Sequence, residues 1–157
     1  MEDFQLYLEL QDLQNRYITV IDEDRIEEWP DFFTEEAVYE IVPRESERLN
    51  LPAGLMHCFG KGMMRDRVVS YRQANVYHPH SYRHFVSGLQ ILERSPDKIV
   101  TRSNYLVVRT LQNLDSEVFQ VGCYEDTVVP SEDGWRYASK RAIFENARVK
   151  ALLVIPV

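Results

Sequence analysis

The chain has 157 residues, a formal net charge of −7, and 45% hydrophobic and 27% charged residues. This length fits one domain, residues 1–157, with a core of its own. The negative charge argues against nucleic acid or an anionic membrane as the partner. The acidic start, Met1-Glu2-Asp3-Phe4, does not resemble a signal peptide, and no apolar run approaches the roughly 18 residues of a membrane span. Because Cys58 and Cys123 lie in unrelated contexts, we expect reduced thiols in a cytoplasmic protein.

The first half of the chain predicts mainly helices. Apolar residues recur at helical spacing from Leu6 to Ile21, and a short second helix is expected to stop at Pro30. The expected elements are helices at Leu6–Ile21, Arg25–Trp29 and Gly60–Ala74, a strand at Ala37–Val42 and a loop at Pro43–Pro52.

The second half predicts four long strands in succession. Each run is rich in β-branched and aromatic residues and ends in Pro, Asp, Asn or Gly. The runs are Tyr82–Glu93, Ile99–Leu111, Glu117–Val129 and Trp135–Glu145. Helices followed by strands indicate an α+β fold, with the helices packed in the concave side of a strongly curved sheet. The tail Val149–Val157 is too apolar for water, so we expect it to complete the sheet or to contact a neighbour.

Three histidines at alternate positions, His78, His80 and His84, are the clearest candidates for a metal site. On an extended chain they would share one face, where imidazoles can hold zinc or iron. Pro79 interrupts the start of the segment, however, and no carboxylate stands at a characteristic distance. We therefore expect His84 to pack in a strand and the isolated chain to bind no iron or zinc.

Asp22 and Asp24 follow the first helix and allow two interpretations. A carboxylate buried beside Tyr17 and His84 would have a perturbed pKa and could act as an acid or base. Alternatively, the aspartates end and cap helices without any catalytic role, and this interpretation is favoured.

Other motifs argue against a cofactor in this chain. A Rieske cluster needs two cysteines and two histidines in paired motifs, whereas His57 and Cys58 are adjacent and Cys123 has no nearby histidine. The two glycines of Gly60-Lys61-Gly62 could help to bind an anion at a helix start, although a flexible start of the helix is the simpler interpretation. Arginines outnumber lysines, which predicts fixed ion-pair networks within or between subunits.

Four segments, in this order and spacing, carry a resemblance that covers nearly the whole chain. They are YITVIDEDRIEEWPDFFTEEAVYEIVP (Tyr17–Pro43), SYRHFVSGLQI (Ser81–Ile91), TRSNYLVVRT (Thr101–Thr110) and EVFQVGCYEDTVVPSEDGWRYASKRAIFENA (Glu117–Ala147). With them the chain resembles the small (β) subunit of aromatic-ring-hydroxylating dioxygenases, particularly those acting on aromatic carboxylates such as terephthalate, salicylate, anthranilate and benzoate.

The resemblance implies the cone-shaped cystatin-like or nuclear-transport-factor-2-like fold, shared with scytalone dehydratase and ketosteroid isomerase. It also implies a structural subunit with no cofactor or catalytic residue of its own. The Rieske [2Fe-2S] cluster and the mononuclear Fe(II) would lie in a large (α) subunit. The small subunits would form a trimer beneath a trimer of large subunits, in a hexamer of three large and three small chains.

Three functions stay open on the sequence alone. The first is this structural subunit of an oxygenase. The second is a free-standing isomerase or dehydratase that uses the cone as a pocket, with Tyr17, Asp22 and His84 as its acid and base residues. The third is a small-molecule binding module. A cone filled by bulky inward side chains would favour the first, and an open, polar-lined cavity would favour the others.

Overall fold

A computed structural model describes residues 2–51, 54–73, 80–112, 115–145 and 155–157. Its elements are α1 (Glu2–Asp22), the 3₁₀ helix η1 (Ile26–Phe32), β1 (Phe33–Pro43), α2 (Arg44–Arg48), β2 (Met56–Phe59), α3 (Lys61–Gln73), β3 (His80–Arg94), β4 (Ile99–Leu111), β5 (Ser116–Ser131) and β6 (Gly134–Phe144). None of the described helices is long and apolar enough to cross a membrane.

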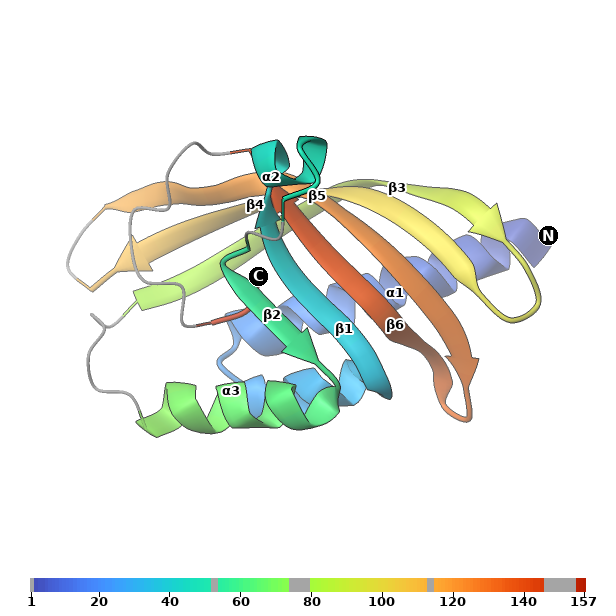
Figure 1. The fold of residues 1–157 in the computed structure, drawn as a ribbon, viewed down its shortest axis with the longest axis horizontal. Helices are drawn as coiled ribbons and strands as arrows, with labels where there is room; N and C mark the ends of the chain where they lie inside the picture. Colours follow the sequence, from blue (N-terminus) through green and yellow to red (C-terminus); the bar gives the residue numbers. More distant parts are fainter. Residues whose placement is uncertain (1, 52–53, 74–79, 113–114, 146–154) are drawn as a thin grey trace.

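The strands form one mixed, six-stranded sheet in the order β2-β1-β6-β5-β4-β3. Only β1 and β6 run parallel; the remaining neighbours are antiparallel. Figure 1 shows that the sheet is strongly bent, that α1 crosses one of its faces, and that α3 lies by the β2–β1 edge. The predicted α+β cone is therefore confirmed, with α1 and α3 on the side toward which the sheet bends.

The sequence predicted most element positions but misread the region between the first and third helices. The segment expected to be a loop at Pro43–Pro52 contains α2, and the short strand β2 was missed. At only four residues, Met56–Phe59 carries too little periodicity to be recognised. Pro30 does not end the second helix but lies inside η1, because the fixed φ of proline suits a 3₁₀ turn.

Helix α1 buries a continuous apolar stripe against the sheet, including Leu6, Leu10, Leu13, Tyr17, Val20 and Ile21. Polar contacts fix its position along the strands. Gln14 donates to Ser103 of β4 at 2.6 Å in a buried hydrogen bond, and Glu9 accepts from the indole N–H of Trp135 of β6 at 2.9 Å. The N-terminal end is further tied to β3 by an ion pair between Asp3 and Arg94. The stripe and these contacts hold α1 across the sheet.

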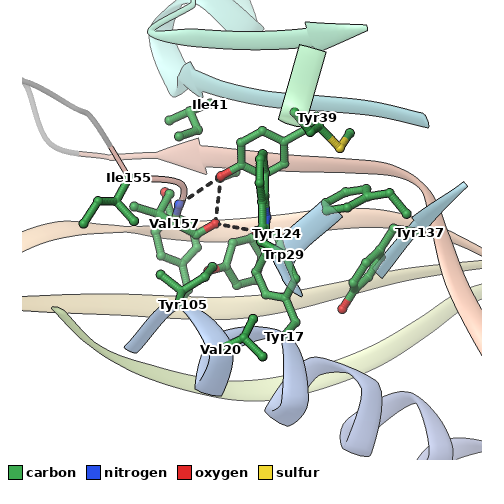
Figure 2. Close-up of a cluster of buried hydrophobic side chains, with 14 of the residues drawn as sticks. Tyr17, Val20, Trp29, Tyr39, Ile41, Tyr105, Tyr124, Tyr137, Ile155 and Val157 are labelled. Atoms are coloured by element: carbon green, nitrogen blue, oxygen red, sulfur yellow. Dashed lines mark hydrogen bonds between the residues drawn. The ribbon is translucent and has the colours of Figure 1, made fainter. Parts of the chain in front are cut away.

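Aromatic side chains fill the space between the helices and the sheet. The largest fully buried ones are Trp29, Tyr17, Tyr39, Tyr105, Tyr124, Tyr137, Phe33 and Phe119. Most pairs meet edge to face, as Trp29 and Tyr39 do with ring centroids 5.1 Å apart, whereas Tyr105 and Tyr124 stack at 4.4 Å. Such pairs contribute about 0.5–1.5 kcal/mol each beyond their area burial. Figure 2 shows that this cluster also surrounds Ile155 and Val157.

A buried lysine lies within the aromatic cluster. The Lys140 ammonium is fully buried and donates to Oδ2 of Asp126 at 2.9 Å. It also lies 3.8 Å, 4.4 Å and 4.6 Å from the ring centroids of Tyr124, Tyr137 and Tyr17. Burial raises the pKa of Asp126 and lowers that of Lys140, while their mutual attraction opposes both shifts. The ion pair and the rings together offset part of the loss of hydration of the two buried charges.

This arrangement predicts that replacing one member of the ion pair destabilises the protein far more than expected from the effect of replacing both. Asp126→Leu should lower the free energy of unfolding by about 3–5 kcal/mol, because it leaves the Lys140 charge buried without its partner. Asp126→Leu combined with Lys140→Met should cost much less than the sum of the single changes. Urea titrations of the four proteins measure this.

Arg16→Ala is the matched control, since the Arg16–Asp12 pair is exposed and should change the unfolding free energy by at most about 1 kcal/mol. Additive effects of the two buried substitutions would contradict the interpretation of Lys140 and Asp126 as one coupled unit.

Candidate functional site

Two of the three alternative catalytic residues, Asp22 and His84, come together in the structure. Asp22 is the last residue of α1, and His84 lies on the edge strand β3. The His84 imidazole is 0% exposed and the Asp22 side chain 5%. Nδ1 of His84 lies 2.5 Å from Oδ1 of Asp22, and the backbone N–H of His84 donates to Oδ2 at 2.9 Å. Both carboxylate oxygens are therefore occupied by one residue of β3.

This double contact fits an anchor of the sheet edge. A strand at an edge has backbone N–H groups with no neighbouring strand to accept from them. Asp22 accepts one of these groups and at the same time orients the imidazole. With the carboxylate as acceptor, Nδ1 of His84 is the donor of the short contact. Nε2 has no hydrogen-bond partner among the described residues.

An oriented imidazole is one requirement of a general base, and access for a substrate is another. Described residues line pockets around Leu13 and Phe32, around Arg44 and Arg102, and around Leu6 and Ile99. Neither Asp22 nor His84 lines any of these three. Asp22 thus ends helix α1, as the favoured interpretation states, and in addition binds His84. Asp24 lies elsewhere and forms an exposed ion pair with Arg72 at 2.9 Å.

Tyr17, the third residue of the alternative site, is directed elsewhere. Its hydroxyl accepts from the indole N–H of Trp29 at 3.2 Å and donates to the carbonyl oxygen of Val157 at 3.0 Å. Figure 2 shows these contacts inside the aromatic cluster. Burial raises the pKa of Tyr17 well above its ordinary value, which keeps the phenol protonated. Its hydroxyl thus serves the core, and the described contacts do not join it to Asp22 or His84.

Val157 is packed among the aromatic side chains of the core. It is 0% exposed, and its carbonyl oxygen accepts from the hydroxyls of both Tyr17 and Tyr39. The prediction that the tail completes the sheet or meets a neighbour is therefore wrong for residues 155–157, which pack inside the chain's own core. Residues 149–154 lie outside the described part of the chain.

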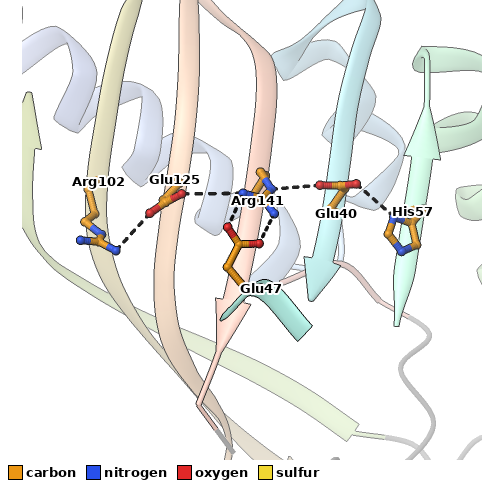
Figure 3. A network of polar contacts seen from close by, with 6 residues as sticks. All are labelled: Glu40, Glu47, His57, Arg102, Glu125 and Arg141. Carbon is orange, nitrogen blue, oxygen red and sulfur yellow. Dashed lines mark hydrogen bonds and ion pairs between the residues drawn. The ribbon is translucent and has the colours of Figure 1, made fainter. Parts of the chain in front are cut away.

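The opposite face of the sheet carries an ion-pair network, referred to below as the outer ladder. In strand order it joins Arg102, Glu125, Arg141, Glu40 and His57, with Glu47 of α2 as a branch (Figure 3). Its strand residues are register partners across β4, β5, β6, β1 and β2. Arg141 alone contacts three carboxylates and lowers the pKa of Glu47 by hydrogen bonding. The ion-pair networks predicted from the arginine excess are thus present within the chain.

The remaining sequence candidates form no metal or anion site in the described residues. There, no three His, Cys, Asp or Glu side chains gather closely enough to hold a metal ion. His78 and the side chain of His80 lie outside the described part, so the expectation for that cluster stays a prediction. Lys61 is buried near Asp31 and Glu35, at 3.6 Å and 3.8 Å, so its charge faces carboxylates rather than a free anion site.

The cysteines cannot act together. Both are free and buried. Cys58 belongs to the main core, whereas Cys123 lies in a small cluster with Val42 and Ile143 and accepts from Arg44 at 3.3 Å. They therefore provide no paired thiolates for an iron–sulfur cluster.

Sequence reasoning missed the Lys140–Asp126 pair. Its signal was present, because both residues fall at inward positions of strands that otherwise alternate, and they are direct cross-strand partners. A charged residue at an inward position requires an opposite charge within reach.

The anchor interpretation of Asp22 yields a prediction about stability. Asp22→Ala should lower the free energy of unfolding by about 1–3 kcal/mol, because the backbone N–H of His84 loses its acceptor in a buried place. Asp22→Asn should cost less, since the amide oxygen can accept from that N–H, and the amide group can donate to Nδ1 once the imidazole carries its proton on Nε2. Urea unfolding and amide exchange at His84 measure both effects, and equal losses in the two variants would argue against the anchor.

Comparisons with known proteins agree with this architecture. The family model of the SnoaL-like domain matches residues 2–141. The small subunit of anthranilate 1,2-dioxygenase from Burkholderia cepacia is 51% identical over 99% of this chain and 97% of its own length. Subunit beta 1 of the terminal oxygenase component of terephthalate 1,2-dioxygenase from Comamonas sp. is 26% identical over 89% of this chain and 91% of its own.

A solved structure agrees over the whole length of the chain. It is the beta subunit of a candidate aromatic-ring-hydroxylating dioxygenase from Novosphingobium aromaticivorans, with a TM-score of 0.90 and 29% identity over 99% of this chain and 98% of that one. The chain therefore belongs to the SnoaL-like family and, within it, to the small (β) subunits of aromatic-ring-hydroxylating dioxygenases.

Proposed function

We propose that this chain is a structural subunit that assembles with a large (α) oxygenase subunit and carries no catalytic residue or cofactor itself. The large subunit would hold the Rieske [2Fe-2S] cluster and the mononuclear Fe(II). The observation that carries the proposal is the filled cone. Its concave side is occupied by Trp29, several tyrosines and Val157, all fully buried. A reaction chamber needs free volume at this place.

The same observation weighs against the free-standing isomerase or dehydratase. That reading needs Tyr17, Asp22 and His84 to converge on a substrate. The Tyr17 hydroxyl is instead engaged by Trp29 and Val157, and both Asp22 oxygens are engaged by His84. The small-molecule binding module meets the same difficulty, because the described interior is packed with side chains.

The outer face of the sheet offers surface for assembly. Phe85 and Leu106 are register partners on β3 and β4, and Val108 and Val118 are partners on β4 and β5. Phe85 and Val118 are 56% and 50% exposed. Apolar side chains grouped on a sheet face are typical of an interface that another chain covers. We propose that this surface is covered by another chain, in the hexamer of three large and three small subunits, with a trimer of small subunits, that the family resemblance implies.

The relatives also suggest the substrate of the assembled enzyme. Anthranilate and terephthalate, named for the two curated relatives, are both aromatic carboxylates. We therefore propose that the complex acts in the breakdown of an aromatic carboxylate, with anthranilate as the first compound to test. Neither nucleic acid nor a membrane is expected as a partner, and the proposed location is the cytoplasm.

The proposal predicts that acid and base candidates in this chain are dispensable for chemistry. In an oxygenase reconstituted with the large subunit, Asp22→Asn and His84→Gln should leave turnover per assembled iron site within a few-fold of wild type. Removing a true general acid or base costs about 10²–10⁴ in rate. Turnover is measured by product formation and normalised to bound iron after gel filtration.

Loss of total activity in proportion to loss of complex would agree with an assembly role. Intact assembly with turnover per iron reduced about a hundredfold would instead place catalysis in this cone.

A further inference from the structure

The last three residues of the sequence are buried, and their contacts include both hydrogen bonds and apolar packing. The Tyr39 hydroxyl lies 2.9 Å from both backbone polar atoms of Val157, donating to the carbonyl oxygen and accepting from the N–H. The Tyr17 hydroxyl donates to the same carbonyl oxygen at 3.0 Å. Both backbone groups of a fully buried residue are thus satisfied by side chains, without any strand partner.

The two tyrosines that contact Val157, and the tryptophan that contacts both of them, come from other parts of the chain. Tyr17 lies on α1, Trp29 on η1 and Tyr39 on β1, more than a hundred residues away in sequence. Trp29 donates to the Tyr17 hydroxyl at 3.2 Å and packs edge to face on Tyr39, so the indole orients both phenols. Ile155 is 6% exposed and adds a second aliphatic side chain to the occupied space.

We propose that Tyr17, Trp29 and Tyr39 form a binding site for a short aliphatic peptide, which Ile155–Val157 occupies in the intact chain. The two phenols bind the backbone oxygen and N–H of one residue, and the aromatic walls select a branched aliphatic side chain. The site takes a peptide of the same chemistry in trans when its own segment is removed. This inference goes beyond the assembly role and does not rest on it, because it concerns the chain without a partner.

The site explains how the cone becomes closed. A buried hydroxyl that loses its hydrogen-bond partner is destabilising, so the phenols favour a cone occupied by an acceptor. A tethered segment has an effective concentration in the millimolar range, which is enough to exclude weakly binding free ligands. The segment therefore fills the concave side of the sheet.

The test uses a chain that ends at residue 154 and an acetylated peptide with the sequence of residues 151–157. The truncated chain should melt at a lower temperature than the full chain. The peptide should bind it saturably in calorimetry and raise its melting temperature. The full chain should bind the same peptide at least about tenfold more weakly, because its site is already occupied. Absence of binding to a folded truncated chain, or equal binding to both chains, would overturn the proposal.

Matched substitutions separate a specific site from general apolar packing. Tyr39→Phe in the truncated chain should weaken peptide binding about tenfold, because one phenol serves both backbone groups of Val157. Tyr137→Phe is the control, since Tyr137 is equally buried in the cluster but has no described hydrogen bond to Val157. A peptide carrying Val157→Asp should fail to bind. Equal effects of the two tyrosine substitutions would contradict the proposed role of the phenols.

A second measurement decides the question if the truncated chain does not fold. In the full chain, Tyr39→Phe should accelerate hydrogen exchange of the Val157 amide about tenfold relative to Tyr137→Phe, because the amide loses its acceptor. Equal exchange rates in the two variants would show that the phenol does not hold the segment, and the proposal would fail.

Discussion

Inside the cone, the ammonium group of Lys140 lies between Asp126 and the rings of Tyr17, Tyr124 and Tyr137. A charge in such a place requires both a counter-charge and a continuous set of polarisable contacts. Asp126 supplies the first from β5, and tyrosines from α1, β5 and β6 supply the second. Because these residues come from different elements, the helix and the two central strands must reach their final positions together. The ion pair thereby links the packing of α1 to the register of β5 and β6.

The rest of the interior follows from this arrangement. Once Tyr17 packs over Lys140, its hydroxyl is directed to Val157, which in turn meets Tyr39. At the end of α1, Asp22 fixes the free edge of the sheet by binding the backbone N–H and Nδ1 of His84. Residues that would form a catalytic set in an open cone therefore serve the closure of a filled one. On the opposite face, the outer ladder pairs charges across five strands.

The sequence predicted the fold well because its strongest signals are local. The long strands after Tyr82 and the apolar spacing of Leu6–Ile21 were identified correctly, whereas four-residue β2 and the 3₁₀ turn through Pro30 were not. The site was harder to predict, since it depends on which distant residues meet. Asp22 and His84 were paired correctly as candidates, but only the folded chain shows that Tyr17 turns away from them. The inward position of Lys140 could have been recognised from the strand pattern. The position of Val157 could not be predicted, because an apolar tail can pack in many places.

The claim that the cone is a filled core can be tested by acrylamide quenching of Trp29. The chain has two tryptophans, and Trp135→Phe leaves Trp29, which is 0% exposed, as the only one. The account predicts that quenching of native Trp29 is far weaker than in the urea-unfolded chain, and that it stays so without any partner subunit. Quenching that approaches the unfolded level in a protein with native circular dichroism would show an open, solvent-filled cone and contradict the account.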